Sequence, residues 1–536
     1  MPSVSRKTVP LQVPAHGLKV TQASDLRTER LELQADAVIV GSGAGGAIAA
    51  YELARAGLRV VVLEAGPYVP SEKFAEMLAV AMGSLYQDQG GQTNADGDIS
   101  ILQGRCVGGS TVVNAALCFR TPDYYLKRWG REFGLSNLTP ATMRPYFERV
   151  ERNLHIRTAG PHETSPGAEL IRAGLSTLGL PPGAARRNVR ECTLSGFCFS
   201  GCRTDRKQSM LVTYLPWAVA HGAVIHADTR VTEVLAEGGQ ARGVRAEVID
   251  PASGAKKADM TVRAPIVVLA AGPVQTPLLL LRSGLANSSD QVGRNFACHP
   301  TLSVTAEFDH EVKDFHGATH SLYMDRDTLP ERGGYLLLNA IQEPVEAGFQ
   351  AEPGTGRPYV AYMSGYRNMI RLISLIHDGN VGRVSWDGDM KRIDYRVDDA
   401  DFASMQKGLV TTAKVLFASG AKRLLLPTSQ VATIERPEQV EAAIGALRNE
   451  PARYRYTSFH PQGTCRMGRD PKTTVVDPHG QTHDVRRLYV ADASLLPTSI
   501  GYNPSETVYA LASYISDRIV QDWRGRRADL RSPAPG

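Results

Sequence analysis

One glycine-rich stretch near the start of the chain constrains the fold more than any other feature. A short apolar run, Val38–Val40, leads into Gly41, Gly43 and Gly46, which have the spacing G-x-G-x-x-G. An Ala-rich stretch follows, and then a second apolar run that ends at Glu64. The pattern predicts a strand, a tight turn, a helix whose N-terminus faces a phosphate, and a parallel strand whose terminal acid holds a ribose hydroxyl. It predicts a dinucleotide ligand and does not distinguish FAD from NAD.

The composition restricts the remaining possibilities. A chain of 536 residues is long enough for two or three domains. The sequence contains 60 Lys and Arg residues and 55 Asp and Glu residues. Because positively and negatively charged residues are interspersed, the composition argues against a nucleic-acid partner. No apolar run approaches the ~18 residues of a membrane span, and the first residues carry no apolar segment of an export signal. We therefore expect no transmembrane segment and a cytoplasmic location.

A second glycine cluster, Gly104–Asn114, contains two adjacent glycines followed by hydroxyl residues. Such a stretch allows the main chain to lie against a flat or anionic group. It resembles the first signature of the glucose–methanol–choline (GMC) family of FAD-dependent oxidoreductases. Later segments resemble further motifs of that family in the same order: Gly272–Leu285, Val292–Pro300, His460–Gly468 and Leu488–Ser494. The segment Arg206–Leu215, behind a cluster of cysteines, is similar in particular to the long-chain alcohol oxidase-like branch.

The chain departs from the family pattern at a few positions. Cys298 stands where an Asp is usual, Cys118 where the first signature has an aromatic residue or Ala, and Ala286 where the second ends in Gly. Val113 stands where some members carry a histidine linked covalently to FAD. Because valine cannot form that bond, the resemblance implies FAD held non-covalently.

The order of patterns predicts an α/β fold with a Rossmann-like FAD-binding domain, built from discontinuous segments, and an inserted α+β substrate domain. Short alternating stretches, Leu302–Phe308, Gly382–Trp386 and Met390–Tyr395, suggest an antiparallel sheet in the inserted domain. The expected divisions are an N-terminal arm (1–34), the FAD-binding domain (35–125, 203–300 and 456–524), a helical and Cys-rich insert (126–202), the substrate-binding domain (301–455) and a C-terminal tail (525–536).

The resemblance also implies which residues contact FAD. The ADP half is expected on the first glycine motif, with the adenine near Val231, and the isoalloxazine against the second glycine cluster. Asp492, after an apolar strand, is expected near the pyrophosphate or ribityl chain, or alternatively as a helix N-cap. The predicted cofactor contacts are Gly41, Ser42, Gly43, Ala44, Gly46, Glu64, Ala65, Arg105, Gly108, Gly109, Ser110, Asn114, Val231, Asp492, Asn503 and Pro504.

His460 and Asn503 are the predicted catalytic pair. Oxidation of an alcohol removes a proton from oxygen and a hydride from carbon, so the protein must supply a base and an orienting hydrogen bond. An imidazole accepts a proton near neutral pH, and an amide stabilises alkoxide-like charge. The resemblance places these two residues above the flavin. We interpret His299 and His377 as structural histidines, with lining of the substrate cavity as the alternative role of His377.

Three of the seven cysteines, Cys192, Cys198 and Cys202, lie close together in the sequence. Free thiols are one interpretation, and a zinc site is a second, although the histidines that follow have no finger-like spacing. The third interpretation is an iron–sulfur cluster, because the spacing resembles that of GMC-type sugar dehydrogenases with a three-iron cluster.

The resemblance predicts FAD-dependent oxidation of an alcohol to an aldehyde or ketone, with oxygen or an electron-acceptor protein as the second partner. Tyr362, Tyr366, Met369 and Trp386 suggest a hydrophobic or aromatic alcohol, or simply core packing. One alternative is an iron–sulfur-containing GMC dehydrogenase that passes electrons to a cytochrome or quinone. A second is a GMC-fold hydroxynitrile-type lyase, in which the flavin is structural.

Overall fold

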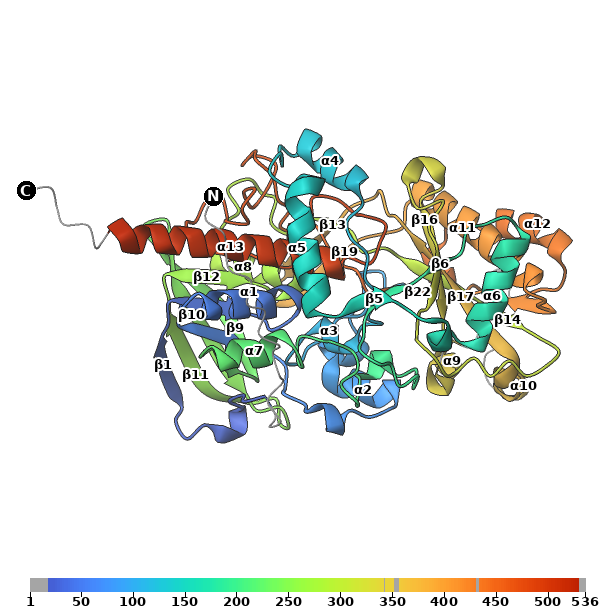
Figure 1. The fold of residues 1–536 in the computed structure, drawn as a ribbon, viewed down its shortest axis with the longest axis horizontal. Helices are drawn as coiled ribbons and strands as arrows, with labels where there is room; N and C mark the ends of the chain where they lie inside the picture. Colours follow the sequence, from blue (N-terminus) through green and yellow to red (C-terminus); the bar gives the residue numbers. More distant parts are fainter. Residues whose placement is uncertain (1–17, 342, 351–355, 430–432, 530–536) are drawn as a thin grey trace, which may run out of the picture.

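The computed structural model describes residues 18–341, 343–350, 356–429 and 433–529, which form two lobes (Figure 1). The left lobe in Figure 1 contains α1, α13 and the strands β1 and β9 to β12. The right lobe contains the strands β14, β16 and β17, covered by α6, α11 and α12. Each lobe has its own hydrophobic core.

A parallel sheet in the left lobe carries the first glycine motif. Its strand order is β23-β12-β2-β3-β8, with bounds β2 Ala37–Val40, β3 Val60–Leu63, β8 Val224–His226, β12 Ile266–Leu269 and β23 Leu488–Val490. Strands β2 and β3 are buried throughout, as expected for continuous apolar runs covered on both faces. Helix α1 (Ala44–Arg55) packs against α7 (Tyr214–Ala220) and α13 (Ser505–Asp529), and α8 (Gly272–Ser283) follows β12. The predicted Rossmann-like arrangement from separated segments is confirmed.

A second, four-stranded sheet flanks the first. Its order is β1-β11-β10-β9, with bounds β1 Arg30–Gln34, β9 Thr229–Glu237, β10 Gln240–Ile249 and β11 Lys256–Arg263. Strand β1 pairs parallel with β11, whereas the other pairs are antiparallel. Residues 30–34 of the expected N-terminal arm thus form an edge strand, and residues 1–17 lie outside the described residues.

The right lobe is built on a nine-stranded sheet. Its main path is β21-β20-β14-β17-β16-β15-β6, and β22 pairs with both β14 and β4. The bounds are β4 Ile99–Ile101, β6 Gly183–Ala184, β14 Thr301–Glu307, β15 Leu322–Met324, β16 Tyr335–Ala340, β17 Met369–Ile376, β20 Arg423–Leu425, β21 Thr433–Ile434 and β22 Tyr456–Ser458. All pairs are antiparallel except β22 with β4. The sheet therefore draws β4, β6 and β22 from outside the segment 301–455.

Strands β18 (Gly382–Asp387) and β19 (Met390–Asp394) do not join this sheet. They pair with β13 (Arg294–Phe296) in a separate three-stranded sheet. The alternating stretches therefore belong to two antiparallel sheets rather than one, because alternation predicts a buried face but not the strand that will be its neighbour.

Helices cover both lobes and connect them. Helices α6 (Pro166–Thr177) and α11 (Asp399–Ala418) pack on β16 and β17, and α12 (Val440–Gly445) packs on α11. Helix α5 (Pro140–Asn153) lies between α4 (Asp123–Glu132) and α13. The remaining helices are α2 Leu78–Leu85, α3 Ser110–Val113, α9 Pro344–Gln350 and α10 Arg357–Ser364. Among the described residues, no helix combines the length and apolar character needed to cross a membrane.

Candidate active site

A cavity of about 1200 Å³ lies where the two lobes meet. One wall comes from the glycine motif after β2 and from the second glycine cluster, and the opposite wall comes from β14, β16 and β17. Pockets for a single small ligand usually measure about 300–1,000 Å³. The cavity is therefore large enough for a dinucleotide together with a small substrate.

The two glycine clusters meet at one wall of this cavity. A side chain at Gly41 would place its Cβ 2.3 Å from the carbonyl oxygen of Ala270, and one at Gly46 would lie 2.0 Å from the carbonyl oxygen of Gly41. At Gly43 the nearest atom is Gly109 Cα, at 3.8 Å. Close packing therefore requires glycine at positions 41 and 46. At position 43 the lack of a side chain leaves the main chain facing the cavity, as binding of a pyrophosphate requires.

Glu64, directly after β3, ties the two glycine clusters together. The N–H and hydroxyl of Ser42 donate to Glu64 Oε2 at 3.0 and 2.6 Å, and Gly66 N donates to Oε1 at 2.9 Å. The Ser42 hydroxyl also accepts from Gly108 N at 3.0 Å. Burial raises the pKa of Glu64, and the hydrogen bonds from Ser42 and Gly66 oppose that shift. Glu64 thus organises the wall as well as facing the cavity.

Most of the predicted cofactor contacts reach the cavity. Those that line it are Gly41, Gly43, Ala44, Glu64, Ala65, Arg105, Gly109, Ser110, Asn114, Val231, Asp492, Asn503 and Pro504. Within the described structure Ser42, Gly46 and Gly108 lie behind this wall instead. Their part in the site is to hold the glycine clusters in position.

Asp492 follows β23 and is surrounded by protein donors. Gly272 N and the Thr276 hydroxyl donate to its Oδ2 at 2.8 and 2.6 Å, and Ser494 N donates to Oδ1 at 2.8 Å. Asp492 is the N-cap of a short 3-10 helix, which is the alternative role considered from the sequence. Its carboxylate also joins the end of β23 to the start of α8.

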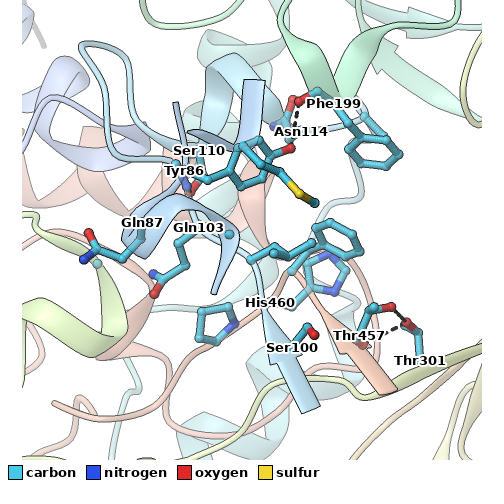
Figure 2. Close-up of a pocket in the computed structure, with 18 of the residues that line it drawn as sticks. Tyr86, Gln87, Ser100, Gln103, Ser110, Asn114, Phe199, Thr301, Thr457 and His460 are labelled. Atoms are coloured by element: carbon cyan, nitrogen blue, oxygen red, sulfur yellow. Dashed lines mark hydrogen bonds between the residues drawn. The ribbon is translucent and has the colours of Figure 1, made fainter. Parts of the chain in front are cut away.

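His460 and Asn503 come together at the cavity. His460 Nε2 lies 3.0 Å from Asn503 Nδ2, and both residues line the cavity. Figure 2 shows His460 in the same pocket as Ser110 and Asn114 of the second glycine cluster. Burial lowers the pKa of His460 well below its usual value, and the neighbouring His299 and His320 lower it further. The imidazole is therefore neutral, and the buried Asn503 Oδ1 has no partner among the described residues.

A buried chain of polar groups continues from His460 away from the cavity. His460 Nδ1 lies 3.3 Å from His299 Nδ1, and His299 Nε2 lies 2.9 Å from the hydroxyl of Ser499. The Ser499 hydroxyl is hydrogen bonded to Asp378 Oδ1 at 2.8 Å. Asp378 is 2% exposed and also accepts from Cys298 N at 2.6 Å. The chain therefore links a buried carboxylate to the predicted base.

Two arrangements of the hydrogen atoms can be drawn for this buried series of polar groups. When Asp378 is ionised, Ser499 donates to it and accepts from His299 Nε2, so His460 carries its hydrogen on Nδ1 and Nε2 is free to accept a proton. In this arrangement the N–H of Gly501, 3.1 Å from His299 Nε2, faces a second donor. When Asp378 is protonated, the donors reverse, and the N–H of Gly501, 3.1 Å from His299 Nε2, donates to that nitrogen. His460 then carries its hydrogen on Nε2. Burial raises the pKa of Asp378, and hydrogen bonds from Cys298 N and Ser499 oppose the shift.

Asp378 and Ser499 were not predicted from the sequence. His299, interpreted as structural, is fully buried and does not line the cavity, yet it contacts the predicted base. His377 contacts the carbonyl of Ser499 at 3.1 Å and likewise lies outside the described cavity lining. The departure at Cys298 was the available signal, because a carboxylate from a distant segment binds the main chain at this position.

The wall opposite the glycine clusters is mixed in character. It includes a row of hydroxyls on β14 and apolar side chains on β16 and β17: Thr301, Ser303, Thr305, Leu338, Ile373 and Leu375. The stacked rings of Phe199 and Phe459, with centroids 5.4 Å apart, also line the cavity, and Figure 2 shows Phe199 above His460. In the described structure Tyr362 reaches the cavity, whereas Tyr366, Met369 and Trp386 do not.

The three clustered cysteines are partly exposed, whereas the other four are buried. The sulfurs of Cys192 and Cys198 face Arg187, whereas the sulfur of Cys202 accepts from Lys207 N at 3.3 Å. Among the described residues, no group of three or more His, Cys, Asp or Glu side chains is arranged to hold a metal ion. An iron–sulfur cluster requires thiolates that converge on one point, and its presence here stays a prediction.

Comparison with known proteins agrees with this architecture. Residues 82–301 and 378–512 match the two GMC oxidoreductase family profiles, and residues 36–93 match an FAD binding domain. An uncharacterised GMC-type oxidoreductase of Sinorhizobium fredii is 32% identical over 507 residues, which cover 93% of this chain and 97% of that protein. A long-chain-alcohol oxidase of Arabidopsis thaliana is 29% identical, over 93% of this chain and 70% of the relative.

A solved structure shares the fold at low sequence identity. A formate oxidase variant of Aspergillus oryzae superposes with a TM-score of 0.69 at 16% identity, covering 93% of this chain and all of that chain. The chain belongs to the GMC oxidoreductase family, and it is an FAD-dependent oxidoreductase.

Proposed function

We propose that this protein oxidises a hydrophobic alcohol to an aldehyde or ketone, with His460 as the base. The observation that carries the proposal is the pairing of His460 Nε2 with the Asn503 amide, 3.0 Å apart, at the cavity wall that also carries the two glycine clusters. A neutral imidazole next to an amide is suited to bind and deprotonate a hydroxyl group.

The residues of the cavity fit FAD. The main chain at Gly43 and the N-terminus of α1 face the cavity and suit a pyrophosphate. We propose that the ADP half lies there, with a ribose near Glu64 and the adenine near Val231, and that the isoalloxazine lies against the second glycine cluster. Val113 has no nucleophilic atom, so the cofactor is held non-covalently. When bound, FAD supplies the hydride acceptor.

Side chains of the protein accept and transfer the proton of the alcohol. With Asp378 ionised, His460 Nε2 accepts the hydroxyl proton of the alcohol, while the Asn503 amide holds the oxygen. The proton charge does not stay on His460, whose buried imidazole disfavours it. Transfer from His460 Nδ1 to His299, from His299 to Ser499 and from Ser499 to Asp378 neutralises the carboxylate instead. Asp378 is thus a positioning residue that sets which nitrogen of His460 is basic.

The substrate proposal rests on the cavity wall and on the relatives. Leu338, Ile373 and Leu375 provide an apolar surface, and Phe199 with Phe459 provides an aromatic one. Relatives named long-chain-alcohol oxidases cover most of this chain, which supports a hydrophobic alcohol as the substrate and oxygen as the electron acceptor.

Stopped-flow spectroscopy of the flavin-loaded protein tests the proposal. Anaerobic mixing with linear primary alcohols of increasing length, benzyl alcohol and a secondary alcohol should bleach the flavin band with at least one of them, and admission of air should restore it. His460→Ala should remain yellow but bleach about 10²–10⁴-fold more slowly, the usual contribution of a general base. His162→Ala, a change at an exposed histidine, is the matched control.

Three outcomes would contradict the proposal. The first is a preparation that binds no flavin. The second is bleaching at an unchanged rate in His460→Ala. The third is release of an aldehyde from a hydroxynitrile without any bleaching, which would indicate the lyase chemistry instead.

A further inference from the structure

Two buried cations lie beside the clustered cysteines. Arg187, on β7 (Arg186–Asn188), and Lys207 are each 2% exposed. Among the described residues no carboxylate forms an ion pair with either cation, although the charge of Glu163 acts on Arg187 from a greater distance. Because a buried charge without a counter-charge is strongly destabilising, a neighbouring group is expected to supply negative charge.

The neighbours of these cations are thiols. Arg187 Nη2 donates to Cys198 Sγ at 3.4 Å and Nη1 to Cys192 Sγ at 3.9 Å, while its buried Nε has no partner among the described residues. Lys207 Nζ donates to the carbonyl oxygen of Cys198 at 2.7 Å. Burial opposes ionisation of Cys198, but the charges of Arg187 and Lys207 outweigh it and lower the pKa of the thiol.

We infer that Cys198 is a reactive thiolate held by Arg187, at which hydrogen peroxide oxidises this protein reversibly, with Cys192 as the resolving thiol. The Cys198 sulfur attacks one peroxide oxygen, the O–O bond breaks, and a sulfenic acid and hydroxide form. The Cys192 sulfur then attacks the Cys198 sulfur and displaces hydroxide. Overall, two thiols and one peroxide give one disulfide and two waters.

The geometry selects Cys192 rather than Cys202 as the second thiol. The sulfurs of Cys192 and Cys198 lie on neighbouring nitrogens of one guanidinium group. The sulfur of Cys202 instead accepts from Lys207 N and lies near the hydroxyl of Thr204, at 3.7 Å.

This site lies next to the catalytic cavity. Phe199, the residue after Cys198, lines the cavity, and Lys207 Nζ also binds the carbonyl oxygen of Asn114 at 2.7 Å. One element of this inference rests on the proposed function: the protein's own source of peroxide would be the reoxidation of the cofactor by oxygen. The experiments below use added reagents, so their failure is distinguishable from failure of that function.

The first experiment measures alkylation by iodoacetamide between pH 5 and 10, resolved by mass spectrometry for each cysteine in the folded, flavin-loaded protein. Cys202 is the control within the molecule, because it is also partly exposed but does not contact Arg187. We expect the midpoint for Cys198 to lie below that for Cys202, and Arg187→Met to raise it. Coinciding midpoints would overturn the inference, and this comparison stands even if Arg187→Met does not fold.

The second experiment adds hydrogen peroxide in the presence of dimedone, which traps sulfenic acids. The wild-type chain should form a Cys192–Cys198 disulfide that dithiothreitol reverses, and Cys192→Ser should accumulate the dimedone adduct on Cys198. A disulfide to Cys202, or no oxidation at Cys198, would overturn the inference. Stoichiometric iron that protects all three thiols would do so as well, in favour of the iron–sulfur alternative.

Discussion

Asp378→Asn tests how the buried chain sets the basic nitrogen of His460. An asparagine of nearly the same shape can keep its oxygen on Cys298 N, where the carboxylate now accepts at 2.6 Å. Its amide N–H₂ then faces the Ser499 hydroxyl and donates to it. Ser499 must in turn donate to His299 Nε2, so His299 carries its hydrogen on Nδ1 and His460 carries its own on Nε2. The variant should therefore fold but should present the wrong tautomer to the substrate.

The magnitude follows from the contacts that the basic tautomer would break in this variant. For His460 Nε2 to be free in the variant, one donor–donor contact must form in a buried position in addition to the contact between Gly501 N and His299 Nε2 that the wild type has in the same arrangement. An unsatisfied buried polar group costs roughly 1–3 kcal/mol, so we expect the limiting rate of flavin reduction to fall about 10- to 100-fold. In serine proteases, an Asp→Asn change at the carboxylate that contacts the catalytic histidine lowers kcat about 10⁴-fold through the same tautomer error. The smaller loss of rate is expected here because two groups, Ser499 and His299, lie between Asp378 and His460.

The assay is anaerobic flavin reduction between pH 5 and 9. Burial raises the pKa of Asp378 above its usual value, and the ionised form is the competent one, so the wild-type rate should fall as the pH falls through that pKa. His377, His299, Asp401, Tyr395 and Cys298 are the titratable groups that influence Asp378 or lie against it. Asp378→Asn should be slow at every pH and should lack the acidic limb.

Asp314→Asn is the control for Asp378→Asn. Asp314 is also a buried carboxylate that accepts from a main-chain N–H, Gly167 N at 2.9 Å, but it lies outside the described lining of the large cavity. The control should reduce the flavin at the wild-type rate. Reduction by Asp378→Asn within about threefold of wild type, with the acidic limb intact, would refute the reasoning.

Further predictions concern the cofactor wall, the amide and a buried acid. Gly43→Ala should fold but weaken FAD binding at least tenfold by equilibrium titration, because the new Cβ enters the space of the pyrophosphate. Gly46→Ala should instead lower the melting temperature, because its Cβ would lie 2.0 Å from a carbonyl oxygen. Asn503→Ala should slow flavin reduction about 10²-fold, as for loss of one oxyanion donor, and normal rates would exclude the amide from the reaction. Burial raises the pKa of Asp314 to about 6, so ionisation destabilises the fold above that pH by an amount on the order of 3 kcal/mol; Asp314→Asn should melt higher than wild type at pH 8 and equally at pH 4.

The cofactor side of the site was largely predictable from the sequence. The roles of Gly41, Gly43 and Gly46 depend on local geometry, since a strand, a turn and a helix within 30 residues fix where each glycine lies. His460 and Asn503 were predictable only through the resemblance, because 43 residues and a strand separate them and no local pattern brings an imidazole to an amide.

The buried chain behind His460 could not be predicted in the same way. Asp378 ends up near His299 because β17 runs antiparallel to β14, with Thr301 opposite Leu375, and that register depends on packing across the whole sheet. The alternating pattern at β18 likewise did not predict which strand would pair with it. Arg187 illustrates a further limit, because an arginine in a polar stretch gives no sign that it will be buried among thiols.

The contact between Gly43 and Gly109 has a consequence for how this protein can change. Where these residues meet, the cavity is bounded by main-chain atoms alone. The opposite wall includes side chains on β14, β16 and β17. The molecule therefore separates a wall of main chain from a wall of side chains, and libraries that seek new alcohols should be confined to positions 303, 338, 373 and 375, with the glycines left untouched.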